Sequence, residues 1–211
     1  SYASVRGASC QRHHVKPTGY QQSIAWVRRA KREAILRIAV YGTGGVGGYY
    51  GGRLAEAGED VVFIARGEHL AALLDQGLRV DSTKGDFIVT PVEATDDPAA
   101  VGKVDVVMVC VKCWQVPEAA EAIRPMIGPD TYVLPMENGV EAPGQLAEIL
   151  GWNHVLGGVC GIVSFKAGPG HIQHVAYEPF VNFGEWDNRR SDRVDRLYEA
   201  FSRAKGLIVA A

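Results

Sequence analysis

Apolar runs that stop at glycine or a polar residue alternate with stretches of helical period. Four runs are almost continuously apolar and rich in β-branched residues, which is typical of strands covered on both faces. These predicted strands span 36–41, 61–65, 104–112 and 131–136. Four other segments repeat apolar residues at spacings of three and four, as amphipathic helices do. These predicted helices span 44–57, 68–76, 116–127 and 145–150.

The rest of the chain is richer in strand patterns. Residues 80–92 are typical of two short strands around a Lys84-Gly85 turn, and 192–204 has the period of a helix. Further strands are predicted at 155–163, 170–175, 180–183 and 207–210. Alternating strands and helices predict an α/β fold with right-handed crossovers. We expect a Rossmann-like, doubly wound, mostly parallel sheet with extra C-terminal strands.

A glycine-rich hexapeptide joins the first predicted strand to the first predicted helix. It matches G-x-G-x-x-G and consists of Gly42, Thr43, Gly44, Gly45, Val46 and Gly47. The first glycine allows a tight turn, the second lets the main chain approach a diphosphate, and the third lets the helix lie close to the strand. The N–H groups at the helix N-terminus then favour phosphate. Because a second strand also follows, we predict a dinucleotide site rather than a glycine-rich turn without a ligand.

An arginine marks the end of the second predicted strand. Arg66 follows Gly47 by 19 residues, where an NAD-binding protein usually has an acid that accepts from the ribose hydroxyls. A carboxylate would repel a 2′-phosphate, whereas a guanidinium can bind it with two charge-assisted hydrogen bonds. The sequence therefore predicts NADP(H) as the cofactor, with an ordinary surface arginine as the alternative.

Two polar residues follow the next two predicted strands, at the sheet edge where open α/β folds bind ligands. Lys112 suits a cofactor phosphate, and the Asn138 amide could bridge the cofactor and a carbonyl substrate. The alternatives are a solvated lysine and an Asn-Gly turn.

Other reactive residues give weaker signals. Cys110 and Cys113 have redox-motif spacing, but we interpret them as inert core sulfur, and Trp114 as a packing residue. His171 and His174 would face opposite sides of a strand, so no metal site is expected. No Ser-His-Asp set or carboxylate pair stands out.

Composition and charge narrow the range of partners. Hydrophobic residues make up 47% and charged residues 22% of the chain, which excludes wholesale disorder. The longest unbroken apolar run has six residues, 106–111, whereas a membrane helix needs about 18 to 20. Residues 1–37 carry eight basic residues and one acid, and the remainder carries 14 basic and 23 acidic residues. We expect a small anionic ligand, with no nucleic acid or membrane as partner.

The basic segment at 1–35 is interpreted as an N-terminal extension of a dinucleotide-binding domain at 36–211. We expect it to be disordered or a leader, since a transit-type leader has this basic, acid-poor composition. An arm that contacts nucleic acid is a further alternative.

Several ordered motifs resemble those of the ketopantoate reductase (2-dehydropantoate 2-reductase) family. They are RIAVYGTGGVGGYYGGRLAEAGEDVVFIARG, VCVKCWQV, ENGV and PGHIQH, and the resemblance runs from about Arg37 to Ala211. It implies that the glycine loop binds NADPH, that Arg66 and Lys112 serve the adenosine-phosphate side, and that Asn138 lies near the nicotinamide and the substrate. It also implies the reduction of ketopantoate to pantoate, for coenzyme A synthesis, by a cytoplasmic enzyme; organellar targeting is the alternative.

The resemblance covers only the family's nucleotide-binding half. Its general-acid lysine lies in an all-helical second domain that this chain lacks, so the lysine is expected beyond Ala211 and this chain alone is expected to be inactive. The same domain could form a homodimer. Two other functions stay open: reduction of another 2-oxo acid, and a non-catalytic NADP(H)-binding module, which the absence of an acid/base pair favours.

Overall fold

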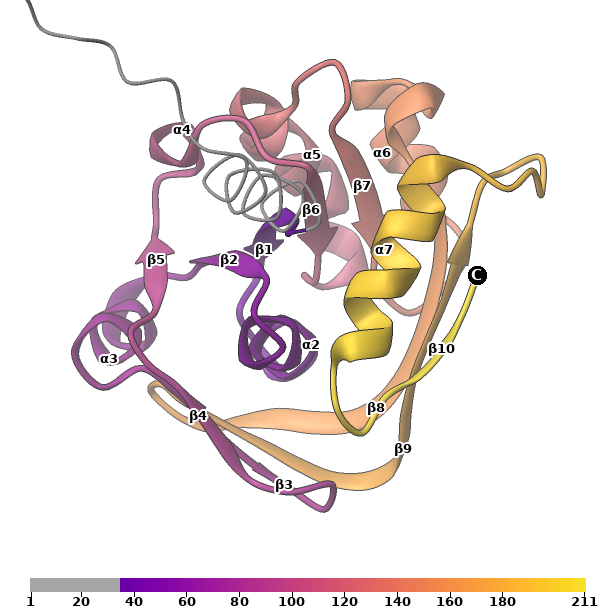
Figure 1. Ribbon diagram of the computed structural model, residues 1–211. Helices are drawn as coiled ribbons and strands as arrows, with labels where there is room; N and C mark the ends of the chain where they lie inside the picture. The colour runs from indigo at the N-terminus through magenta and orange to yellow at the C-terminus, as the bar shows by residue number, and fades with distance from the viewer. Residues whose placement is uncertain (1–34) are drawn as a thin grey trace, which may run out of the picture. The chain divides into compact units, whose positions relative to one another are not determined.

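The first of two sheets contains the strands that precede the predicted binding motifs. The computed structural model describes residues 35–211 (Figure 1). The strand order is β5-β2-β1-β6-β7, and all neighbours are parallel. The strands are β1 (Arg37–Tyr41), β2 (Asp60–Ile64), β5 (Glu93–Thr95), β6 (Val106–Val109) and β7 (Tyr132–Pro135). The order reverses between β1 and β6, which is where open α/β sheets bind ligands.

Helices cover both faces of this sheet. Residues of α5 and α6 pack on the face formed by Ala39, Val107 and Val133, whereas α2 and α7 pack on the face formed by Ile38 and Met108. Alternate residues of each strand thus belong to different core clusters, as the strand geometry requires. The helices are α2 (Gly45–Glu56), α3 (Gly67–Gln76), α4 (Pro98–Val101), α5 (Val116–Ile123), α6 (Ala142–Leu150) and α7 (Asp192–Arg203).

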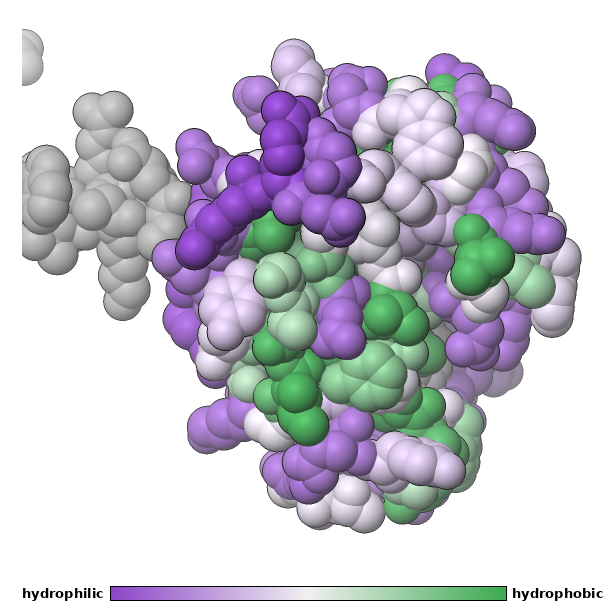
Figure 2. Space-filling view, turned by 90° about the vertical axis from the view of Figure 1, so that its right-hand side faces the viewer, coloured by the Kyte–Doolittle hydropathy of each residue, from purple (hydrophilic) through white to green (hydrophobic). Residues whose placement is uncertain are grey.

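The second sheet is built on a long hairpin of β8 and β9. One edge of β9 pairs antiparallel with β8, and its other edge pairs parallel with β3 and then with β10. The strands are β3 (Leu78–Ser82), β4 (Phe87–Val89), β8 (Gly157–Gly168), β9 (His171–Gly184) and β10 (Ile208–Ala210). Figure 2 looks onto the right-hand side of Figure 1, where hydrophobic side chains are exposed among polar ones. Val159 of β8 and Ile208 of β10 are among the exposed hydrophobic residues of this sheet.

Helix α2 lies between the two sheets (Figure 1). A Cβ atom added at Gly51 would lie 2.7 Å from Val40 of the first sheet, and one at Gly48 would lie 2.6 Å from Ile172 of the second. The glycines of α2 therefore have a packing role, because larger residues would push the sheets apart. Tyr49 and Tyr50, in the same helix, are fully buried.

The predicted fold class is confirmed, and several boundaries need correction. The strands predicted at 170–175 and 180–183 are one strand, β9, although Tyr177 has a φ of 66° within it. The helix predicted at 145–150 begins at Ala142, because Pro143 is tolerated in the first turn. The helix predicted at 116–127 ends at Ile123. The short elements β5 and α4 were not predicted.

The predictions of an N-terminal extension and of no membrane helix concern the whole chain, of which the structure describes residues 35–211. The extension predicted at 1–35, with its leader and nucleic-acid alternatives, lies outside the described residues apart from Ile35. Within 35–211, no helix combines the length and apolar character needed to span a bilayer.

Candidate functional site

A cleft of about 1050 Å³ lies where the carboxyl ends of the parallel strands meet. The loops that follow β1, β2, β6 and β7 all contribute to its lining, and so does β8 of the second sheet. Eight of the nine residues predicted to bind the cofactor line this cleft. They are Gly42, Thr43, Gly44, Gly45, Val46, Arg66, Lys112 and Asn138. The structure thus brings together residues that lie up to 96 positions apart in the sequence.

The ninth residue, Gly47, lies beneath the glycine loop and does not line the cleft. A Cβ atom added to it would lie 2.3 Å from the Gly42 carbonyl oxygen and 2.9 Å from the Val40 side chain. Gly47 therefore allows the helix to lie close to β1, which is the role predicted for the last glycine of the motif. Gly47 therefore shapes the loop that lines the cleft, and its binding to a cofactor stays a prediction.

The glycine loop turns sharply from β1 into α2. Gly42 has a φ of +99°, which favours glycine. The Thr43 hydroxyl donates to the carbonyl of Ile64 at 3.1 Å and ties the loop to the end of β2. No side chain caps the N-terminus of α2, and no acid lies in its first turn. The free N–H groups of that turn can therefore donate to an anion.

The loop has open space only on the side of the cleft. A Cβ atom added at Gly44 would meet no atom within 4 Å, whereas one at Gly45 would lie 2.4 Å from the Ser164 carbonyl oxygen of β8. A side chain at Gly44 would therefore fill the space beside the helix N-terminus. This open cradle of main chain fits a diphosphate, so the residues present are suited to a dinucleotide.

Three cations of the cleft have no acidic partner in the part of the chain that the structure describes. Among the described residues, ten lysines and arginines form ion pairs with carboxylates, and Lys103 donates to a carbonyl. The cations without such a partner are Arg66, Lys112, Lys166 and Lys205, and the first three line the cleft. Positive charge here is therefore available to an anionic ligand.

A buried acid, which sequence reasoning missed, lies beside Asn138. Both carboxyl oxygens of Glu137 are buried, and neither has a hydrogen-bond partner among the described residues. Burial raises the pKa of Glu137 to about 7. Asn138 itself is exposed and lines the cleft, and it lies with Gly139, which has a φ of +102°, in a sharp bend of the chain. The only sequence signal for Glu137 was an acid directly after an apolar strand.

The structure corrects the interpretation of Cys113 and Trp114, in the segment after β6, as core residues. Cys113 is exposed, and 75% of the Trp114 surface is accessible, so neither residue is part of the core. Gln115 accepts a hydrogen bond from the main-chain N–H of Lys112 at 3.2 Å, which caps the short 3-10 turn Cys113–Gln115 that precedes α5. Cys110 is the half-buried member of the pair, and desolvation raises its pKa well above the usual value. The two cysteines therefore have different surroundings.

The two histidines of β9 have structural partners away from the cleft. His171 lies 2.9 Å from Asp81, and His174 lies 2.9 Å from the Ser82 hydroxyl. The other ring nitrogen of His174 faces two main-chain carbonyls. Within 35–211, no cluster of three or more His, Cys, Asp or Glu side chains could hold a metal ion.

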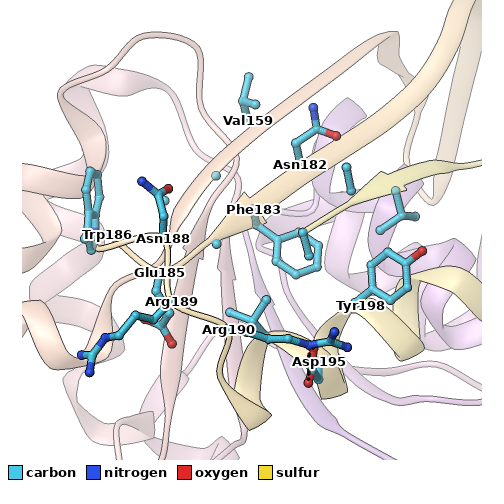
Figure 3. Close-up of a pocket in the computed structure, with 17 residues that line it drawn as sticks. Val159, Asn182, Phe183, Glu185, Trp186, Asn188, Arg189, Arg190, Asp195 and Tyr198 are labelled. Atoms are coloured by element: carbon cyan, nitrogen blue, oxygen red, sulfur yellow. Dashed lines mark hydrogen bonds and ion pairs between the residues drawn. The ribbon is translucent and has the colours of Figure 1, made fainter.

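A second hollow, a groove of about 1190 Å³, lies along β9, β10 and α7 (Figure 3). Arg190 lies against Asp195 at 2.8 Å, and Arg189 contacts Asp187 at 2.5 Å. Glu185 binds Arg193 at 2.5 Å, and this hydrogen bond lowers the pKa of Glu185. The labelled basic side chains of this groove are therefore neutralised by acids, unlike those of the cleft.

The fold and the cleft together define a Rossmann-type dinucleotide-binding domain. The family model for "Ketopantoate reductase PanE/ApbA" matches residues 38–188. The chain is 36% identical to 2-dehydropantoate 2-reductase of Nostoc over 173 residues, which cover 80% of this chain and 54% of that protein. It is 34% identical to oxidoreductase YkpB of Bacillus subtilis over 174 residues, or 82% and 57% of the two chains.

Solved structures agree with this assignment. The crystal structure of 2-dehydropantoate 2-reductase from Porphyromonas gingivalis has a TM-score of 0.77 and 36% identity, over 83% of this chain and 64% of that one. D-Mandelate dehydrogenase, solved with NADH and anilino(oxo)acetate, shares the fold at a TM-score of 0.73 and 20% identity, over 82% and 56% of the two chains. The chain belongs to the ketopantoate reductase family of nicotinamide-dependent oxidoreductases, and it spans about half the length of its curated relatives.

Proposed function

We propose that this chain supplies the NADPH-binding domain of a reductase that converts ketopantoate to pantoate. The observation that carries the choice of NADPH is Arg66, a guanidinium at the end of β2, next to the glycine loop, that has no acidic partner within residues 35–211. NAD-binding proteins usually place an acid at this position. The proposed substrate rests on relatives named 2-dehydropantoate 2-reductase.

Each part of the cleft has a separate task in this proposal. The main chain at Gly44 and Gly45 binds the diphosphate, Arg66 binds the 2′-phosphate, and Lys112 adds positive charge on the same side. Asn138 orients the carbonyl group of the substrate beside the nicotinamide. When bound, the cofactor supplies the hydride.

A proton must also reach the oxygen atom of the reduced carbonyl. Asn138 can orient that oxygen, but an amide is a poor acid. The resemblance to the family predicts that a lysine outside these 211 residues donates the proton. We therefore propose that residues 1–211 bind NADPH but do not oxidise it when ketopantoate is added.

Calorimetric titration of the folded chain with NADPH and with NADH tests the choice of cofactor. We expect NADPH to bind about 10-fold tighter or more, because a hydrogen bond to a charged group is worth about 1.5–3 kcal/mol. Equal affinities, or no binding of either cofactor, would contradict the proposal. Absorbance at the NADPH band, with and without ketopantoate, tests the expected lack of turnover against a control without protein.

A further inference from the structure

One cation of the cleft comes from the second sheet and has no task in the proposed function. Arg66 and Lys112 follow strands of the parallel sheet, whereas Lys166 lies near the end of β8. Its side chain is exposed, and no ion pair or hydrogen bond holds it within the described part of the chain. We propose that Lys166 is a phosphate-binding residue of the dinucleotide site, so that both sheets bind the cofactor. This inference rests on the proposed function.

The position of β8 brings Lys166 close to the glycine loop. A Cβ atom added at Gly45 would lie 2.4 Å from the Ser164 carbonyl oxygen and 2.9 Å from the Phe165 Cα atom. The strand therefore touches the N-terminus of α2, where the diphosphate is expected. Ser164 and Lys166 both line the cleft, as residues two positions apart on one strand can.

The surroundings of His69 place Lys166 on the Arg66 side of the cleft. His69 lies in the first turn of α3, directly after Arg66, and its Nδ1 atom accepts from the Gly170 N–H at 2.9 Å. Burial, and then the charge of Lys166, lower the pKa of His69. Lys166 is thus close enough to α3 to act on a charged group there. In the proposed site, the candidate phosphates for Lys166 are the 2′-phosphate assigned to Arg66 and the diphosphate assigned to the loop.

The acids of the cleft leave this charge available. Asp96, Glu118 and Glu137 also line the cleft, but none of them forms an ion pair with Lys166 among the described contacts. Burial keeps the Glu137 carboxyl largely protonated below a pH of about 7. A lysine side chain is a flexible point charge, so Lys166 can move toward a phosphate without any change in the main chain.

Lys166→Gln and Lys205→Gln form a matched pair of variants for a test. Both remove the charge of a lysine that lacks an acidic partner, but Lys205 does not line the cleft. We expect Lys166→Gln to weaken NADPH binding by about 5- to 20-fold in low salt, as the loss of one charged contact does. Lys166→Arg should retain most of the affinity. Lys205→Gln should bind like the wild type, and circular dichroism should show all variants folded.

The same titrations with NADH identify the phosphate. A loss confined to NADPH assigns Lys166 to the 2′-phosphate, and an equal loss with both cofactors assigns it to the diphosphate; either result supports the inference. If Lys166→Gln binds both cofactors as Lys205→Gln does, the inference is wrong while the proposed function stands. If the wild type binds neither cofactor, both are wrong.

Discussion

The two hollows of this domain have similar volumes and basic linings, yet their electrostatics differ. The groove along β9 and α7 measures about 1190 Å³ and the cleft about 1050 Å³. In the groove, Arg189 and Arg190 each bind an acid, whereas Arg66 and Lys112 in the cleft bind no acid of residues 35–211. The comparison leads us to predict that unpaired charge, more than the number of basic residues, distinguishes the hollow that binds an anion. Four predictions can break or sharpen it, and they follow from the largest expected effect to the smallest.

The largest effect is expected at Gly47, because the main chain of the cleft depends on it. In Gly47→Ala the new Cβ atom would lie 2.3 Å from the Gly42 carbonyl oxygen, so the loop must move. We expect a loss of about 1–3 kcal/mol in the free energy of unfolding from overpacking. NADPH affinity should fall on the order of 100-fold because the loop is misplaced. Thermal melts and calorimetry measure the two effects.

Gly144→Ala is the matched control for Gly47→Ala. Gly144 lies in α6, and a Cβ atom added there would meet nothing within 4 Å. Alanine in a helix should stabilise the protein by about 0.5–1 kcal/mol. NADPH binding should not change. A Gly47→Ala variant that behaves like Gly144→Ala would contradict the packing role assigned to Gly47.

The second prediction compares one acid from each hollow by its effect on stability as pH changes. The carboxyl oxygens of Glu137 are buried without a side-chain ion pair among the described residues, and desolvation, partly opposed by nearby main-chain groups, raises its pKa from 4.5 to about 7. The unfolded chain therefore loses this proton at a lower pH than the folded chain, so stability falls as pH rises through 4.5 to 7. Glu137→Gln should leave stability unchanged near pH 4 and raise it by about 3 kcal/mol at pH 8.

Glu185 should show the opposite sign. Its hydrogen bond with Arg193 lowers its pKa, so the stability it contributes is present above an unfolded-state pKa of 4.5 and is lost as pH falls through the lowered folded-state value. Glu185→Gln should therefore destabilise the protein at pH 8, by about 1–2 kcal/mol, and less at pH 3. Urea unfolding at a series of pH values measures both variants. The same pH trend in both variants would contradict the contrast between the hollows.

The sequence predicted the cleft better than it predicted the second sheet, for physical reasons. The glycine loop, Arg66, Lys112 and Asn138 each follow an apolar strand directly, and the ends of parallel strands must meet at one edge. The local sequence pattern was therefore enough to predict that these residues meet in one cleft. The exception within the parallel sheet is β5, whose three residues are too few to show a period.

Burial and pairing between distant segments were not predictable in the same way. Lys166 reaches the cleft only because β8 packs against the glycine loop, 121 positions from Gly45 in the sequence. Whether an arginine is neutralised can depend on an acid brought near it by the fold, as Glu93 is for Arg37, 56 positions away in the sequence. Glu137 looked like an ordinary loop acid until the packing around it was known. These features follow from tertiary contacts, which no local pattern specifies.

The third prediction removes the cation that carries the choice of cofactor. Arg66→Ala should weaken NADPH binding by about 10- to 100-fold, which corresponds to the loss of a hydrogen bond to a charged group worth about 1.5–3 kcal/mol. NADH binding should change little, since NADH lacks the 2′-phosphate. Parallel titrations with both cofactors measure the effect. An equal loss with both would show that Arg66 does not bind the 2′-phosphate.

The smallest effect is expected for an arginine of the groove, and it decides whether the comparison holds. Arg190 is highly exposed and already bound to Asp195, so it offers little net charge to an anion. Arg190→Ala should leave NADPH affinity within about 2-fold and shift the melting temperature by no more than about 2 °C. If NADPH affinity fell as much as in Arg66→Ala, an arginine that is already paired with an acid would contribute to NADPH binding as strongly as an unpaired one. The pairing of each cation would then not distinguish the two hollows.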